Sequence, residues 1–116
     1  MTELTKAEKC KLIAEALGIK VVIIDDCCFE QPPEYLTIQC GPCYDPYRYD
    51  AQAMEVVKEF RLDILSYENG IYEVTKTVTA INSDISTIYP QSEDLNTAIV
   101  ECAVQAIQAG WSKGNE

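Results

Sequence analysis

Residues 62–78 read LDILSYENGIYEVTKTV, and this stretch decides the fold. Two β-prone runs flank Asn69-Gly70, the preferred pair for a two-residue type I′ turn, so we predict a hairpin of strands 62–68 and 71–78. The expected register pairs Tyr67 with Tyr72, Leu65 with Val74 and Asp63 with Lys76. All six side chains would then share one face of the hairpin, and we expect that face to pack against a helix.

Upstream of this hairpin, the chain predicts a helix and a second, looser hairpin. Thr5 and Glu8 form a capping box that opens a helix running to about residue 17 and ending at Gly18. Residues 19–24 are mostly β-branched and predict a strand. Residues 25–33 are expected to form a loop, and residues 35–39 a short strand that pairs with the first.

Two further helices are predicted around the central hairpin. Asp50 is expected to N-cap a helix over residues 51–60. Residues 80–93 look like a loop, after which Asp94 or Ser92 caps a third helix that ends at Gly110. The order α-β-β-α-β-β-α predicts an α+β fold, with an antiparallel sheet of about four strands and helices packed as an α/β/α sandwich. At 116 residues we expect a single domain, 1–116.

The charge balance disfavours direct binding to nucleic acid. Nineteen acidic residues face nine basic ones, which gives a net charge of −10. Direct binding to nucleic acid needs clustered Lys and Arg, so this acidic excess disfavours it. Between Lys76 and Lys113 no basic residue occurs; this acidity could simply keep the protein soluble, or it could match a basic protein surface. No apolar run is long enough to cross a membrane and no signal peptide is recognisable, so we expect a cytoplasmic protein.

The residue types limit the chemistry of the chain. It contains no histidine, which excludes Ser-His-Asp and Cys-His catalysis and imidazole zinc sites. No carboxylate pair stands out as an acid and base. We therefore expect no catalytic residues and no cofactor. The six cysteines are expected to be thiols, because disulfides are rare in the cytoplasm.

Cys40-Gly41-Pro42-Cys43 spells the redox motif of thioredoxins. In that setting a helix begins at the motif and lowers the pKa of the first thiol. Here Pro46 disfavours helix at Asp45, and the next helix is expected only near residue 51. Thiol oxidoreductase activity using Cys40 and Cys43 is therefore our third hypothesis. A zinc site of Cys27, Cys28, Cys40 and Cys43 is also disfavoured, because the predicted hairpin separates the two pairs by roughly 17 Å.

Tyrosines surround an arginine in the segment that follows the cysteines. Aromatic and arginine side chains are enriched where proteins bind partners. They could equally anchor a loop, with their rings packed inward and their hydroxyl groups exposed to water. The candidate binding residues are Tyr44, Tyr47, Arg48 and Tyr49.

Three segments resemble the phage ABA-sandwich domain family. They are LIAEALG at residues 12–18, DPYRYDAQAM at 45–54, and the Ala-rich helix that leads to Gly110-Trp111. The longer cysteine-bearing segment, residues 25–43, departs from the family. The resemblance implies a phage or prophage protein with α/β/α layering, and it supplies no catalytic residues.

Two binding hypotheses follow. In the first, the chain is a non-enzymatic phage accessory protein that binds a host protein; one form of it is an acidic inhibitor of a nucleic-acid-binding defence effector such as a CRISPR nuclease. In the alternative, the chain sequesters a small molecule or nucleotide signal, with tyrosines stacking on a base and Arg48 pairing with a phosphate.

Overall fold

The computed structural model describes residues 4–24, 27–30, 43–79 and 85–111. The chain divides into two compact units, residues 1–45 and residues 46–116. The expected α+β class is confirmed, with three helices and an antiparallel four-stranded sheet. The expectation of a single domain stays a prediction.

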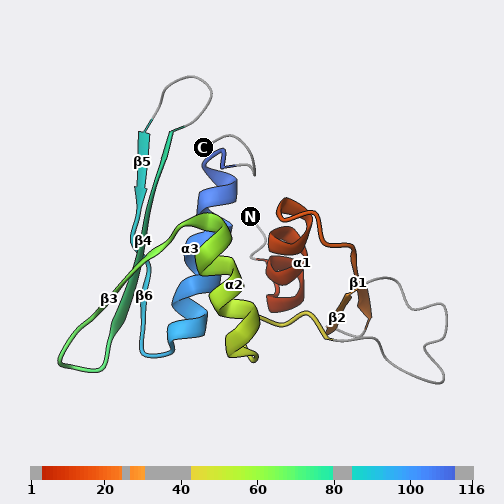
Figure 1. The fold of residues 1–116 in the computed structure, drawn as a ribbon, viewed down its shortest axis with the longest axis horizontal. Helices are drawn as coiled ribbons and strands as arrows, with labels where there is room; N and C mark the ends of the chain where they lie inside the picture. Colours follow the sequence, from red (N-terminus) through yellow and green to blue (C-terminus); the bar gives the residue numbers. More distant parts are fainter. Residues whose placement is uncertain (1–3, 25–26, 31–42, 80–84, 112–116) are drawn as a thin grey trace. The chain divides into compact units, whose positions relative to one another are not determined.

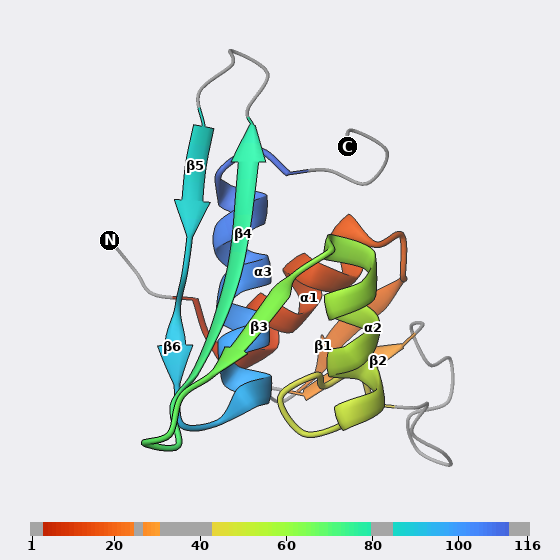
Figure 2. The same ribbon diagram turned by 60° about the vertical axis from the view of Figure 1, so that its left-hand side comes forward.

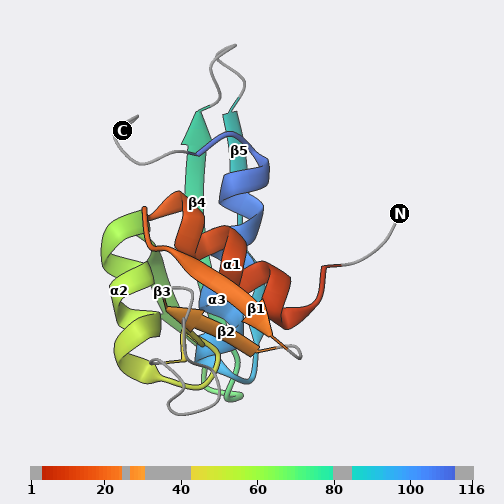
Figure 3. The ribbon, with the colours of Figure 1, turned by 90° about the vertical axis from the view of Figure 1, so that its right-hand side faces the viewer.

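The first unit consists of helix α1 (Lys6–Ala16) and a hairpin of β1 (Val21–Ile24) and β2 (Cys27–Glu30) (Figure 3). The predicted capping box is present, because Thr5 Oγ1 accepts from the Glu8 N–H while Glu8 Oε1 accepts from the Thr5 N–H. Gly18 ends the helix at φ +81°, and the Ile19 N–H donates to the Ala14 carbonyl. This bond completes a Schellman motif, as the glycine predicted.

Strand β2 corrects one prediction. Residues 27–30 were expected to lie in a loop, but they pair with β1 in the register Val21 with Glu30 through Ile24 with Cys27. The hairpin closes over only two residues, so the chain returns much earlier than the predicted pairing with residues 35–39 required. The predicted strand at 35–39 lies outside the described residues.

The second unit consists of α2 (Asp50–Phe60), four strands and α3 (Leu95–Gln108). The strands are β3 (Asp63–Ser66), β4 (Tyr72–Thr79), β5 (Ile85–Ile88) and β6 (Gln91–Ser92). β4 is central: it pairs with β3 on one side and with β5 and β6 on the other, always antiparallel (Figure 2). Helix α3 packs along β4 and α2 packs on α3, so both helices lie on the same side of this sheet (Figure 1).

β5 and β6 correct the prediction of a loop over residues 80–93. Lys76 pairs with Ile88 and Tyr72 pairs with Ser92, so both strands follow one register along β4. They act as one strand that is interrupted at Pro90. Pro90 has no N–H to donate, but its carbonyl accepts from the Val74 N–H at 3.1 Å, which keeps the register. The proline explains why the sequence looked like a loop.

The register of the β3–β4 hairpin also differs from the prediction. Ile64 pairs with Val74 and Ser66 pairs with Tyr72, a shift by one residue. The Gly70 N–H donates to the Tyr67 carbonyl, and Gly70 is the only turn residue with positive φ (+85°). This is a three-residue loop, a type I turn followed by a left-handed glycine, whereas a type I′ turn needs positive φ at Asn69 as well.

The shift moves side chains between faces, because neighbouring residues of a strand point to opposite sides. Leu65 and Tyr67 therefore do not share a face with Val74. Val74 and Val78 are buried on the side of α3, as expected for β4, whereas Leu65 is 48% exposed and Tyr67 46% exposed. The hairpin was predicted correctly, but the face assigned to its first strand was wrong.

The core of the second unit lies between α2, α3 and the helix-facing side of β4. Its largest buried side chains include Phe60, Val56, Val74 and Ile99. Gly110, at φ +111°, ends α3 in a second Schellman motif, with the Trp111 N–H donating to the Ala106 carbonyl. This turn brings the Trp111 ring onto Phe60, stacked at 3.9 Å between centroids.

Candidate functional site

The four predicted binding residues do not form one exposed surface. Tyr44 is 5% exposed and belongs to the first unit, where its N–H donates to the Cys28 carbonyl. Tyr47, Arg48 and Tyr49 belong to the second unit. Arg48 and Tyr49 are exposed, with the Arg48 Cζ 6.0 Å from the centre of the Tyr49 ring. Only this pair has the exposure that a contact role needs.

Tyr47 is held in place by α3. Its hydroxyl donates to Glu101 Oε1 at 3.4 Å, and its carbonyl accepts from Asn96 Nδ2 at 3.2 Å. Asn96 also donates to Asp50 Oδ1 at 2.9 Å. Asp50 was predicted to cap α2, but the N-cap is Tyr49 and no side chain accepts there. The Asp50 carboxylate instead ties the segment to buried Asn96, so Tyr47 has an anchoring role.

Two of the described cysteines, Cys10 and Cys102, lack the features of a reactive thiol. Cys10, Cys28 and Cys43 are thiols of the first unit, and Cys28 Sγ donates to the Ala7 carbonyl at 2.9 Å. Burial, and then the neighbouring Cys28, Asp45 and Cys43, raise the pKa of Cys10 far above its ordinary value. Burial also raises the pKa of Cys102, in the second unit, to about 12. Reactivity needs the thiolate, which burial disfavours at both thiols.

Alkylation tests this directly. In the native protein at about pH 8, we expect iodoacetamide to modify Cys102 roughly 1000-fold more slowly than in urea, because a rise of three pKa units lowers the thiolate fraction by that factor. Cys10 should be protected at least as strongly. Mass spectrometry of the two peptides over time gives both rates. Equal rates in buffer and in urea would contradict the buried position of these thiols.

The described residues supply no metal site. No group of three or more Cys, Asp or Glu side chains among them is arranged to hold an ion. Cys40 lies outside the described residues, and the Cys27 side chain is likewise not described. The redox and zinc hypotheses for Cys40–Cys43 and for the four cysteines therefore stay untested predictions. Across the same described ranges, no helix has the length and hydropathy that crossing a bilayer requires.

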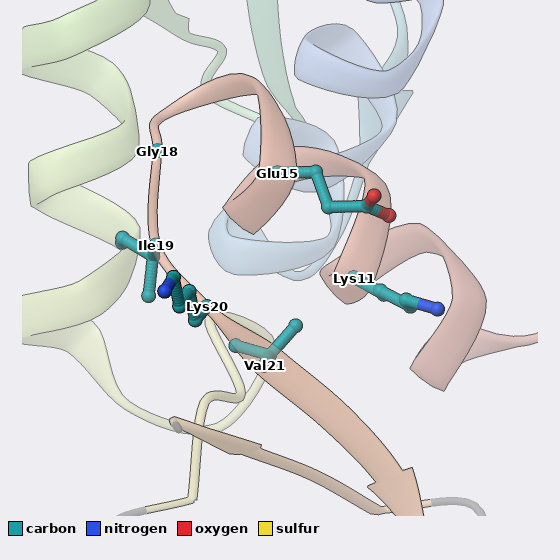
Figure 4. A pocket seen from close by; sticks show the side chains of 6 residues that line it. All are labelled: Lys11, Glu15, Gly18, Ile19, Lys20 and Val21. Atoms are coloured by element: carbon teal, nitrogen blue, oxygen red, sulfur yellow. The ribbon is translucent and has the colours of Figure 1, made fainter. Parts of the chain in front are cut away.

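A groove on the first unit lies between α1 and β1. Its volume is about 470 Å³, and its lining includes Lys11, Glu15 and Lys20. Figure 4 shows the amino groups of the two lysines on opposite sides of the groove. Ligand sites combine an apolar lining with polar groups that converge on one point. This groove lacks such convergence and is the weaker candidate.

The strongest candidate is the side of the four-stranded sheet that faces away from α3. We call it the outer sheet face and define it by Leu65, Tyr67, Glu73, Ile85, Tyr89 and Gln91. Leu65, Glu73 and Gln91 lie opposite one another on three neighbouring strands, and Ile85 pairs with Thr79 at the other end. Side chains alternate between the two faces along a strand, so Tyr89 points to the same side as Ile85 and Thr87. Ile85 is 70% exposed and Tyr89 63% exposed, so large apolar surface meets solvent here.

A fixed carboxylate lies in this face. Gln91 Nε2 donates to Glu73 Oε1 at 2.7 Å, and the Tyr67 hydroxyl donates to Glu73 Oε2 at 3.2 Å. Desolvation and the bond to Glu73 raise the pKa of the Tyr67 phenol, which therefore stays a donor at neutral pH. Both oxygens of Glu73 are thus oriented by residues on the two sides of β4. A charge held in this way attracts a cation with less loss of side-chain entropy.

The charged residues of the outer sheet face are all acidic. Lys76 is the sole basic residue within the four strands. It pairs with the buried Ile88, so its side chain points to the opposite face of the sheet. Asp63 shares the outer register, since it pairs with Thr75. The face thus offers exposed Tyr and Leu side chains beside negative charge. The stretch without basic residues that follows Lys76 did not signal this face, because the acidic residues of the face, Asp63 and Glu73, precede Lys76. The predicted two-residue turn also assigned Leu65 and Tyr67 to the buried side.

A scan against protein-family models gives no match to this chain, and searches of curated proteins and of solved structures give none either. The resemblance to the phage ABA-sandwich domain family stays a prediction. The function proposed for the chain therefore rests on its own residues.

Proposed function

We propose that this chain is a non-enzymatic protein that binds a partner protein with a basic surface. The observation that carries the proposal is the outer sheet face, where Glu73 is fixed between Tyr67 and Gln91 beside exposed Leu65 and Tyr89. Tyrosine is enriched at interface hot spots, and an oriented carboxylate selects lysine or arginine. A net charge of −10 adds long-range attraction to a basic partner.

The finer form of the proposal is a phage accessory protein in the host cytoplasm. Its partner would be a defence effector that normally holds nucleic acid, such as a CRISPR nuclease, with carboxylates of this chain placed where phosphates bind. The acidic composition supports this form, since phosphate-binding surfaces carry clustered lysine and arginine. Identification of the captured partner by mass spectrometry decides it.

A charge reversal tests the contact surface. We expect Glu73→Lys to lower capture of the partner from bacterial lysate at least tenfold at moderate salt, because it removes the fixed carboxylate and places like charge against the partner. The matched control is Glu55→Lys at an exposed position of α2, which makes the same change in net charge and should leave capture within about twofold. Quantitative mass spectrometry of the captured proteins measures both effects.

Two outcomes would contradict the proposal. An equal loss with both variants would mean that net charge alone drives capture. The second outcome is that the lysate yields no protein whose capture depends on Glu73. A ligand of low molecular mass that raises the melting temperature, and loses its effect with Arg48→Ala, would instead support the nucleotide-binding alternative, for which the exposed Arg48–Tyr49 pair is the specific observation.

A further inference from the structure

One edge of the four-stranded sheet has the properties of a docking edge. β5 and β6 form this edge, and in the described part of the chain no strand pairs with their other side. The opposite edge is β3, which is only four residues long and begins with the charged Asp63. Short length and charge are the usual protection of an edge strand. β5 is as short as β3, but β5 and β6 continue each other along β4, and residues 85–92, which read ISTIYPQS, carry no charge.

The hydrogen-bond pattern shows which backbone groups this edge presents. In an antiparallel pair, alternate residues direct both their N–H and C=O toward the neighbouring strand. The Pro90 carbonyl accepts from Val74, so residue 90 and, by alternation, Ile88 and Ser86 face β4. The backbone groups of Ile85, Thr87, Tyr89 and Gln91 then face outward. They span about 20 Å at strand rise.

Pro90 does not interrupt this outward row. Its missing N–H belongs to the side that faces β4, so the proline costs one bond inside the sheet and no donor on the edge. An edge that lacked a donor in its middle would be a poor template for a further strand. Four consecutive outward residues with intact N–H and C=O groups are a good one.

Resting on the proposed function, we propose that an extended, basic segment of the partner pairs with the β5–β6 edge as an additional strand. Main-chain bonds to Ile85, Thr87, Tyr89 and Gln91 supply affinity, and alternate side chains supply specificity. A lysine or arginine side chain on the outer side of the added strand would make two kinds of favourable contact. The stems of several such residues along the added strand cover Ile85 and Tyr89, and the charged group of the residue beside Gln91 reaches across it toward Glu73. A second copy of this chain fits less well, because it brings another net charge of −10.

A synthetic peptide tests the pairing on the full chain. The probe is a ten-residue peptide of alternating valine and lysine, and its control carries N-methyl groups on alternate residues, which removes main-chain donors without changing charge. We expect the first peptide to bind at least tenfold more tightly by fluorescence anisotropy. Hydrogen exchange of the amides of Ile85, Thr87, Tyr89 and Gln91 should slow at least tenfold when it is bound.

A variant of the edge provides the second arm. Thr87→Pro removes one outward N–H and should weaken the peptide at least tenfold, whereas Thr87→Val keeps the N–H and should stay within about twofold. Three results would overturn the inference. They are equal binding of both peptides, unchanged amide exchange at the four positions, and concentration-dependent self-association through this edge. If Glu73→Lys leaves partner capture intact while the edge amides are still protected by peptide, the proposed function fails and strand pairing stands.

Discussion

Phe60→Ala is expected to lower the free energy of unfolding by about 3–5 kcal/mol, the largest effect of any substitution considered for this chain. Phe60 is fully buried, and its ring stacks on Trp111 with an interplanar angle of 16°. The substitution removes a large apolar side chain, leaves a cavity between α2 and the end of α3, and breaks an aromatic contact. Total stabilities of 5–15 kcal/mol are typical, so this loss is a large share.

The chain has a single tryptophan, which makes the measurement direct. Urea unfolding followed by Trp111 fluorescence reports the packing at this contact, and circular dichroism reports the helices. Met54→Ala is the matched control, because Met54 lies on the same helix but is 43% exposed, and we expect a change within about 0.5 kcal/mol. A loss below about 1 kcal/mol for Phe60→Ala would show that Phe60 does not belong to the core.

Alkaline pH is expected to destabilise the protein steeply. In the unfolded chain Cys102 loses its proton near its ordinary pKa of 9.0, whereas in the native protein burial keeps it protonated until about pH 12. The unfolded state therefore binds fewer protons in this window, and stability falls as pH rises through it. Each buried thiol contributes up to about 1.4 kcal/mol per pH unit. Cys10 shifts in the same direction, so both thiols together reach on the order of 5 kcal/mol over two units.

The double variant Cys10→Ala with Cys102→Ala isolates this contribution. Tyrosines and lysines also titrate at alkaline pH, but they do so equally in the variant. Urea unfolding at several pH values above about 9 should give a slope that is shallower in the variant by up to about 3 kcal/mol per pH unit. Identical slopes for the two proteins would show that these thiols titrate alike in the native and unfolded states.

Local sequence chemistry was sufficient for most helix ends. The Thr5–Glu8 box, Gly18, Asp94 and Gly110 each act where predicted, because a cap satisfies backbone groups within a few residues of itself. Asp50 was the exception. Its carboxylate had two possible partners, the first turn of α2 and the distant Asn96, and only the packing of α3 against this segment selects the second.

The strands depended on contacts that the local sequence does not specify. Ser86 and Thr87 lie in a strand because β4 offers them a partner, although nearby Pro90 reads as a loop signal. The site shows the same limit. Tyr44 and Tyr47 have the composition of a contact surface, but burial and hydrogen bonds to distant residues occupy them.

The sequence by itself determined the α+β class, the three helices, the central hairpin and the acidic character of the chain. These follow from apolar spacing, turn residues and charge, which act over a few residues or simply add up. Only the tertiary structure decided which face of the hairpin meets solvent. Within this turn only Gly70 takes the left-handed conformation, so the loop holds three residues instead of two. That single step turned Leu65 and Tyr67 outward, beside Glu73, and created the surface on which the proposed function rests.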